Sequence, residues 1–528
     1  MDTAGENTAP NIRTGAENKL PTPPKPLVDW LAAAISNDFK PSDPIWACGD
    51  ALLSALQISP NQVVRLAHEK LHSFPHQDVP IYWRRLFEEA SLHVALKAMQ
   101  GVMTNERIDH SQSSSSSQLD WISIVVETLD KAAIISGLPG REQLVHRLID
   151  GLENVLYDSC NQDRRDQNEP YMKRRKIERA MMVPNREVLQ FATHFFHKPK
   201  ILHAIPAHSN LPFDQFQDHL LANRGSPTPL IIQDALVYWP ALSDPSRSWS
   251  DPHYLLRKTL GGRRLVPVEF GRSYTDAGWG QRIITFREFM SNCLLRKCSE
   301  ATTLSGWNVA AEEEPEQSER HSGATQCSAN SEYQTSKRKI NLTGYLAQHD
   351  LLSQIPSLRS DIAIPDYCYC ATAATPQESE SMSSSDEPLM NAWLGPGGTI
   401  SPLHTDPYHN IFCQVVGSKY IRLYAPDQTS HLYPHGIDEQ GVDMSNTSQI
   451  DLQPFISRDK GGPVDVPRGH DSENAASESP VAERFPLFEK AQYVEGLLGP
   501  GDCLYIPKGW WHYVESLSTS FSVSFWWN

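Results

Sequence analysis

The sequence predicts an α+β protein, in which an all-helical N-terminal domain precedes a C-terminal double-stranded β-helix, the jelly-roll arrangement of two facing sheets. Two patterns predict this fold. Apolar residues recur at helical spacing before about residue 205, and later many short segments of alternating apolar and polar residues are separated by turn residues. With 528 residues the chain exceeds what one hydrophobic core usually serves, so two folded domains are expected.

The helical domain is expected over residues 26–205, after a polar, proline-rich tail at 1–25 that we expect to be disordered. Two runs of apolar residues recur every three or four positions, namely Trp83, Leu86, Phe87, Ala90 and Val94, and Leu144, Leu148, Leu152 and Val155. This region contains no cluster of catalytic residue types. Its expected role is therefore that of an accessory scaffold or a docking site for a partner.

The jelly-roll domain is expected over residues 206–528. In its last strand Phe521, Val523 and Phe525 alternate with serines, which places one aromatic face against a core. Residues 413–424 predict a pair of strands with Gly417-Ser418 at the turn. Three polar segments are predicted to be disordered insertions in loops, because a surface loop lengthens at little entropic cost. They cover residues 299–338, 375–388 and 459–482.

The net charge of −16, from 47 basic and 63 acidic residues, argues against direct nucleic-acid binding over the whole chain. It suits a basic protein partner, such as a histone tail or a ribosomal protein. The alternative is that acidic insertions carry much of the excess charge.

Location is predicted from three features of the sequence. The nine cysteines form no CxxC pair, which indicates reduced thiols, and no apolar run has the length needed to span a bilayer. The cluster Lys173-Arg174-Arg175-Lys176 is a candidate nuclear localisation signal, although such runs are also common on solvated helix faces. We expect a nuclear protein, with the cytoplasm as a second location and no membrane association.

A metal site is predicted from three residues. In a β-strand alternate side chains share a face, so His404 and Asp406 can point at one metal ion, and His512 near the C-terminus can supply a third ligand from a neighbouring strand. Two histidines and one carboxylate with open positions are the ligand set of non-haem Fe(II) oxygenases. A lone His-x-Asp is common by chance, but its combination with Lys419 and the later Trp-His512 favours the metal site.

These segments resemble the JmjC (Jumonji C) domain oxygenases. The resemblance rests on Asn391 to His404, on Gly417-Ser-Lys419-Tyr-Ile-Arg-Leu-Tyr424 and on the closing Ser522-Val-Ser-Phe-Trp-Trp-Asn528. The segments Tyr274 to Trp279 and Gly344-Tyr-Leu-Ala-Gln-His349 add to it. The resemblance implies a cupin-like jelly roll, Fe(II) as the metal, 2-oxoglutarate as the cosubstrate and O2 as the oxidant.

The resemblance also implies which residues hold the cosubstrate. The matching positions are Lys419, Asn410, Ser401 and Tyr274, and Lys419 supplies the charge that the distal carboxylate of 2-oxoglutarate needs in a dry barrel. Tyr274 depends on the resemblance alone. The resemblance places Trp393 beside the substrate channel, although it could equally be a core residue.

The expected reaction is hydroxylation of a protein side chain, with arginine as the first interpretation. A guanidinium needs a carboxylate, for which Glu269 is the candidate, although it could be an ordinary surface residue of a strand. The alternative is demethylation of a histone N-methyl-lysine by the same oxidative chemistry. A third interpretation, of another class, is an inactive JmjC module that binds chromatin or ribosomal partners.

Overall fold

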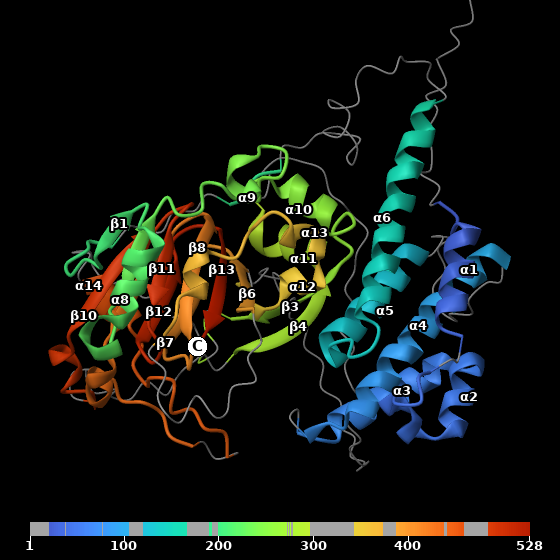
Figure 1. The fold of residues 1–528 in the computed structure, drawn as a ribbon, viewed down its shortest axis with the longest axis horizontal. Coiled ribbons are helices and arrows are strands. Elements are labelled where there is room, and N and C mark those ends of the chain that lie inside the picture. The colour runs from blue at the N-terminus through green and yellow to red at the C-terminus, as the bar shows by residue number, and fades with distance from the viewer. Residues whose placement is uncertain are drawn as a thin grey trace, which may run out of the picture.

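The computed structural model describes two parts of the chain, a helical domain and a jelly-roll domain (Figure 1). The described residues are 21–36, 39–75, 78–104, 120–165, 189–192, 199–271, 273, 275, 278–295, 343–372, 387–437, 441–458 and 484–528. The predicted α+β fold class is confirmed, with a helical N-terminal region and antiparallel sheets in the C-terminal region. Within the described residues, no helix combines the length and apolar character that crossing a bilayer requires.

The described residues of the N-terminal domain form six α-helices, and the two helices expected from the apolar runs are present. These helices are α1 (Lys25–Ala34), α2 (Asp50–Ile58), α3 (Pro60–His72), α4 (Ile81–Thr104), α5 (Trp121–Ser136) and α6 (Glu142–Arg165). The start and end of α5 follow from its sequence. Asp120 accepts hydrogen bonds from the backbone N–H groups of Ile122 and Ser123 at 3.1 and 3.2 Å, and Gly137 ends the helix with φ of 73°.

In the described part of the chain, thirteen strands make two sheets that face each other, antiparallel except for the parallel pair of β1 and β2. The larger sheet has the order β1-β2-β11-β8-β13-β6-β5-β3-β4, and the smaller has the order β10-β9-β12-β7. The strands are β1 (Ala207–Ser209), β2 (Leu230–Gln233), β3 (Leu265–Phe270), β4 (Gly280–Thr285), β5 (Gly344–His349), β6 (Leu389–Gly395), β7 (Ile400–His404), β8 (His409–Val416), β9 (Lys419–Tyr424), β10 (Tyr493–Leu498), β11 (Cys503–Ile506), β12 (Trp511–Ser516) and β13 (Ser520–Trp527). This arrangement is the predicted jelly roll.

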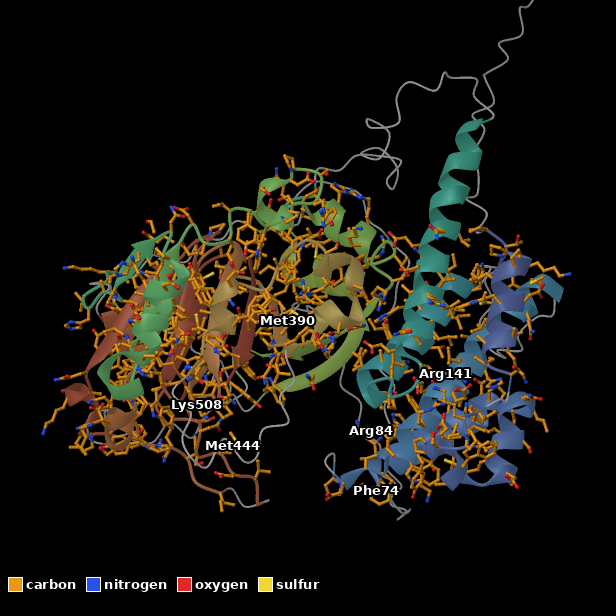
Figure 2. All side chains as sticks on the ribbon, in the orientation of Figure 1. Phe74, Arg84, Arg141, Met390, Met444 and Lys508 are labelled. Atoms are coloured by element: carbon orange, nitrogen blue, oxygen red, sulfur yellow. The ribbon has the colours of Figure 1, made fainter. Side chains whose placement is uncertain are left out.

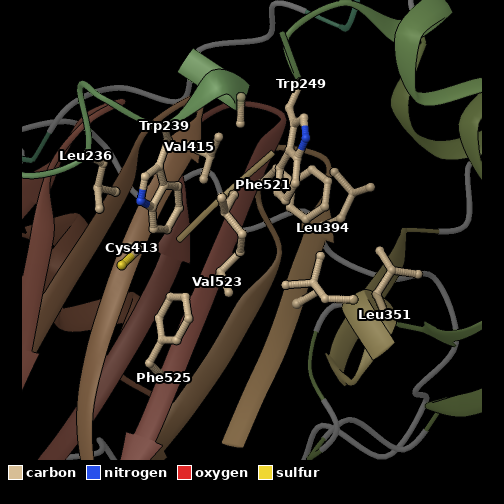
Figure 3. Close-up of a cluster of buried hydrophobic side chains, with 14 of the residues drawn as sticks. Leu236, Trp239, Trp249, Leu351, Leu394, Cys413, Val415, Phe521, Val523 and Phe525 are labelled. Atoms are coloured by element: carbon tan, nitrogen blue, oxygen red, sulfur yellow. The ribbon is translucent and has the colours of Figure 1, made fainter. Parts of the chain in front are cut away.

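Short helices cover the outer face of the larger sheet and fill the connections between strands (Figure 1). They are α8 (Phe213–Gly225), α9 (Pro240–Ser243), α10 (Pro252–Lys258), α11 (Phe286–Phe289), α12 (Leu351–Gln354), α13 (Pro356–Arg359) and α14 (Gln453–Arg458). The alternation along β13 has its expected result, because Phe521, Val523 and Phe525 all enter the core. In that core the Trp249 ring stacks on Phe521 with centroids 4.4 Å apart (Figure 3).

The prediction of paired strands at residues 413–424 was wrong in one respect. Two strands are present, but β8 belongs to the larger sheet and β9 to the smaller, so they do not pair with each other. Gly417 makes this crossing with φ of +71°, and a Cβ atom there would run into the carbonyl oxygen of Thr519. A local turn signal shows where a strand ends, but it does not show which sheet the next strand joins.

Several predicted segments lie outside the described residues. The basic cluster at 173–176 and most of the tail and of the three insertions are among them. The described chain resumes at residues 189–192, where Phe191 already packs against the jelly-roll core. Ile201 and Ile205 also pack on this domain, so the chain contacts the jelly roll before residue 206.

Candidate metal centre and cosubstrate pocket

Two neighbouring strands and the loop after one of them bring His404, Asp406 and His512 together. His404 ends β7, and the antiparallel pairing of β7 with β12 places His512 directly opposite it, with ring centroids 4.2 Å apart. Asp406 lies just beyond the strand, and its carboxylate oxygens lie 4.0 Å from Nε2 of His404 and 3.5 Å from Nε2 of His512. One donor atom from each residue falls within 4.8 Å of the other two.

The two imidazoles are oriented by backbone carbonyl groups. Nδ1 of His404 lies 2.7 Å from the carbonyl oxygen of Pro402, and Nδ1 of His512 lies 3.0 Å from that of Trp510. Donation from Nδ1–H leaves the lone pair on each Nε2, which faces the carboxylate. Burial lowers the pKa of His404 to about 4, with His512 adding to the effect, so this imidazole is neutral and able to bind a metal at pH 7.

The Asp406 carboxylate stays ionised in this setting. Burial opposes its charge, but the neighbouring His512 and, less strongly, His404 hold its pKa below the ordinary value. Two imidazoles and one carboxylate on one side of a cavity fit a divalent metal with open positions on the other side. No other group of three His, Cys, Asp or Glu donors with this spacing occurs in the described chain.

A buried lysine lies in the same cavity. Lys419 is 0% exposed, and its ammonium lies over the Phe412 ring at 5.0 Å and over the Tyr345 ring at 5.6 Å. Its Nζ donates to the Tyr345 hydroxyl at 3.2 Å, and no carboxylate of a described residue forms an ion pair with it. Burial lowers the pKa of Lys419 to about 7. A buried ammonium without a carboxylate partner is suited to an anion that arrives from outside the chain.

Most of the predicted site residues line one cavity. Those that do are His404, Asp406, His512, Lys419, Asn410, Ser401 and Trp393. Asn410 is 4% exposed, and its buried side-chain oxygen has no hydrogen-bond partner among the described residues. The pocket thus offers a cation that has no ion-pair partner among the described residues, beside the three metal donors, which fits a bound carboxylate ligand.

Tyr345 lines this cavity and was missed by the sequence reasoning. It lies on β5 and is 6% exposed, with its hydroxyl on the lysine ammonium. The segment Gly344 to His349 carried part of the resemblance, so the signal was present, but the cosubstrate role was assigned to Tyr274. Tyr274 lies outside the described residues.

The two residues proposed for the substrate side take different positions. Trp393 lies on β6, where its indole N–H donates to the Ser524 hydroxyl at 2.9 Å, and its ring lies 6.1 Å from that of Tyr345. Glu269 is half-buried on β3, opposite Tyr345 in the ladder, and does not line the cavity of the metal donors. It accepts a hydrogen bond from the Trp279 indole at 3.2 Å. Burial nevertheless raises its pKa above the ordinary value.

A loop and a turn near the candidate metal site lie toward one end of the jelly roll. Figure 2 labels Met444, from the loop after β9, and Lys508, from the turn between β11 and β12, at the lower end of this domain. The backbone N–H of Gly509, in the same turn as Lys508, donates to the carbonyl oxygen of Asp406 at 3.1 Å. The turn before His512 therefore also fixes the backbone of the acidic ligand.

The fold and these residues define a class of protein, a jelly-roll protein in which two histidines and one carboxylate could hold a metal ion and a buried lysine lies beside them. Residues 213–528 match the model of the cupin-like domain. The chain is 30% identical over 469 residues to lysine-specific demethylase 8 of Danio rerio, and this match covers 88% of the chain and 86% of that protein.

Two further relatives match a little over half of the chain. The chain is 36% identical over 299 residues to Jumonji C domain-containing protein 5 of Drosophila melanogaster, covering 57% of the chain and 54% of that protein. It is 24% identical over 329 residues to bifunctional peptidase and (3S)-lysyl hydroxylase JMJD7 of Homo sapiens, covering 60% of the chain and 81% of that protein. The chain belongs to the cupin-like JmjC family of 2-oxoglutarate-dependent dioxygenases, as the resemblance predicted.

Proposed function

We propose that this chain is an Fe(II)- and 2-oxoglutarate-dependent protein hydroxylase that acts on arginine side chains. The observation that supports the cofactor part is that one cavity holds three metal donors and the buried ammonium of Lys419, which has no carboxylate partner among the described residues. When bound, iron and 2-oxoglutarate supply the O2 activation that oxidises a substrate C–H bond. His404, Asp406 and His512 would hold the metal, and the chain's other residues bind, orient and exclude water.

In this proposal Lys419 holds the distal carboxylate of 2-oxoglutarate. Its ammonium is already oriented by Tyr345, which leaves its remaining N–H groups for an anion. Asn410 and Ser401 line the same cavity and supply further hydrogen bonds. The walls formed by Phe412, Ile506 and Val514 are apolar and keep water from the reacting centre.

Arginine is the proposed target because of Glu269. Its carboxylate lies on the strand next to Tyr345, and burial makes its charge costly unless a cation is added. A guanidinium can form two parallel hydrogen bonds with it and stack on an indole face, and Trp279 already contacts the same carboxylate. An ammonium is a compact point charge and would not form these two parallel hydrogen bonds.

Lysine demethylation is the second candidate, because the Danio rerio relative is named a lysine-specific demethylase. In that case the aromatic rings of Trp393 and Tyr345 would contact the methylated ammonium, and the hydroxylated methyl group would leave as formaldehyde. The third candidate, an inactive binding module, would have no use for an intact donor triad beside a buried lysine.

The proposed substrate is a basic protein, such as a histone or a ribosomal protein, and the proposed location is the nucleus, with the cytoplasm second. The net charge of −16 supports a basic partner through electrostatic steering. Fluorescence imaging of the tagged chain, with and without the basic residues 173–176, tests the location. Loss of nuclear signal on their removal is the expected result.

The test of the reaction is mass spectrometry of arginine-containing and methyl-lysine-containing histone and ribosomal peptides. The purified chain is incubated with Fe(II), ascorbate and 2-oxoglutarate, and His404→Ala is the inactive control. Gain of one oxygen on arginine is expected. Loss of a methyl group with formaldehyde release would favour the demethylase instead, and no consumption of 2-oxoglutarate would favour the binding module.

A matched pair of variants tests the role of Glu269. Glu269→Gln removes the charge but keeps the shape, so KM for the arginine peptide should rise roughly 10- to 100-fold, the effect of one charge-assisted hydrogen bond. Gln281→Ala changes an exposed residue that faces Glu269 on β4, and it should leave KM unchanged. An unaltered KM in Glu269→Gln would argue against the guanidinium site.

A further inference from the structure

A carboxylate of the helical domain is buried against the jelly roll. Asp130 on α5 is 1% exposed, and its two oxygens accept hydrogen bonds from Nε of Arg264 at 2.9 Å each and from Nη2 at 2.7 Å. One of these oxygens also accepts the backbone N–H of Leu265, the first residue of β3, at 2.7 Å. A single side chain therefore neutralises a buried guanidinium and holds the backbone of a strand in the other domain.

Asp130 occupies a place where the sheet lacks a strand partner. β3 pairs with β5 at its far end, where Glu269 faces Tyr345, but β5 then turns away and pairs with β6 through His349. At the near end of β3, Asp130 takes the N–H of Leu265, and the Gln354 side chain donates to the carbonyl oxygen of Leu265 at 2.9 Å. Buried backbone groups need such partners, so these two side chains stand in for the missing ladder bonds.

The loop before β3 is shaped to reach the helical domain. Leu260, Gly261 and Gly262 have consecutive positive φ angles of 53°, 70° and 83°. This conformation places Leu260 in the hydrophobic core of the helices, and a Cβ at Gly262 would approach the Cβ of Arg287 to 2.7 Å. A non-glycine residue with positive φ is strained, so the contact that it makes compensates for a conformational cost.

A second ion pair fixes the start of the same helix. Nε of Arg263 donates to the carboxylate of Asp120 at 2.8 Å, and Asp120 is the N-cap of α5. Figure 1 shows α5 on the side of the helical domain that faces β3 and β4. The neighbouring residues Arg263 and Arg264 thus bind two carboxylates of one helix, which sets both the position and the rotation of β3 relative to it.

The other end of β3 lies at the active site. Glu269 follows Leu265 by four residues, or about 13 Å along an extended strand. It pairs with Tyr345, whose hydroxyl contacts Lys419 in the cosubstrate pocket. A packed strand moves as a unit, so a displacement at Leu265 would reach Glu269 and Tyr345.

We propose that the helical domain sets the position of the substrate side of the active site, with Asp130 as the positioning residue that holds β3. The metal donors lie on β7, on β12 and in the loop after β7, and Lys419 begins β9, so they lie on strands other than β3, which reaches the cosubstrate pocket through Tyr345. Loss of Asp130 should therefore impair the use of substrate more than the consumption of 2-oxoglutarate. This proposal rests on the proposed function, because it takes Glu269 as the residue that binds the substrate arginine.

The test compares Asp130→Asn with Glu127→Gln, a change on the exposed face of the same helix. The ratio of hydroxylated arginine peptide to 2-oxoglutarate consumed should fall at least fivefold in Asp130→Asn, while 2-oxoglutarate turnover without peptide stays within about twofold of wild type. Amide hydrogen exchange should become faster from Leu265 to Phe270. The Glu127→Gln variant should match wild type in all three measurements.

A double variant separates positioning from stability. Asp130→Leu with Arg264→Met removes both buried charges, so the unfolding temperature should approach that of wild type. The N–H of Leu265 still lacks its acceptor on α5 in this double variant. The product ratio should remain low. If it recovers together with the unfolding temperature, or if it is unchanged in Asp130→Asn, Asp130 serves stability alone and the proposal is overturned.

Failure of the proposed function gives a different result. If the wild-type chain oxidises no arginine peptide, the reaction assigned above is wrong, whatever Asp130 does. Amide exchange at the Glu269 end of β3 and along β5 then decides the inference. Faster exchange there in Asp130→Asn supports it, and unchanged exchange overturns it.

Discussion

At the scale of single residues, the buried ammonium of Lys419 is the feature with the clearest consequences. When protonated, it places a charge in an apolar wall, between Phe412 and Tyr345, and no carboxylate of the described residues compensates that charge. Replacing Lys419 by an apolar residue should therefore weaken the binding of 2-oxoglutarate but stabilise the ligand-free protein.

Lys419→Met should weaken 2-oxoglutarate binding at least 100-fold and make the ligand-free protein more stable, by about 1–3 kcal/mol, because a buried unpaired charge is replaced by an apolar side chain. Thermal unfolding and calorimetric titration with Mn(II) in place of iron measure the two effects. Lys490→Met, in an exposed surface position, is the control. A less stable Lys419→Met variant would show that the ammonium already has a strong partner.

The pKa of about 7 for Lys419 also predicts a pH dependence. Above pH 7 the free site is neutral, and binding of the anion must take up a proton, so the apparent Kd for 2-oxoglutarate should rise by up to tenfold per pH unit. Titration at pH 6.5, 7.5 and 8.5 in two buffers of different ionisation enthalpy measures both affinity and proton uptake.

Linkage gives the matching effect on stability. The unfolded lysine keeps its proton up to about pH 10.5, whereas the folded one loses it near pH 7, so this group makes the ligand-free fold more stable as the pH rises between these values. An affinity that does not change with pH would mean that Lys419 stays charged throughout.

At the scale of elements, the crossing from β8 to β9 depends on one glycine. Gly417→Ala should destabilise the jelly roll by about 2–4 kcal/mol, because the residue needs a positive φ and a Cβ would strike the backbone of Thr519. Denaturant unfolding measures the loss. The matched control is Gly441→Ala. Gly441 also has a positive φ, of 83°, but no described atom lies within 4 Å of the added Cβ, so backbone strain alone should destabilise this variant, by about 1–2 kcal/mol. Equal losses in the two variants would contradict the steric argument.

Elements also show where sequence reasoning succeeds. The helical spacing in α4 and α6 and the alternation in β13 arise from local geometry, so the residue pattern alone reveals them. The pairing of β8 and β9 with strands of opposite sheets arises from long-range contacts, and a turn signal at Gly417 contains no information about them.

At the scale of the whole molecule, the metal should stabilise the fold. The three donors come from β7, from the loop after it and from β12, so a bound ion joins distant parts of the chain. Mn(II) at 100 times its Kd should add about 2.7 kcal/mol to the free energy of unfolding, and a chelator should remove this gain. Differential scanning calorimetry of wild type and His512→Ala tests it. A metal-dependent shift that persists in the variant would point to another site.

The sequence by itself determined the fold class and a set of residues that the fold gathers in one cavity. It could do so because strand periodicity is local and because a metal and an anion each demand particular side chains, such as His404, Asp406 and Lys419. Only the tertiary structure decided that Tyr345 contacts Lys419 and that Asp130 of the helical domain holds β3. These contacts join residues 74 and 134 or more positions apart, and neither residue type nor spacing indicates such a partner.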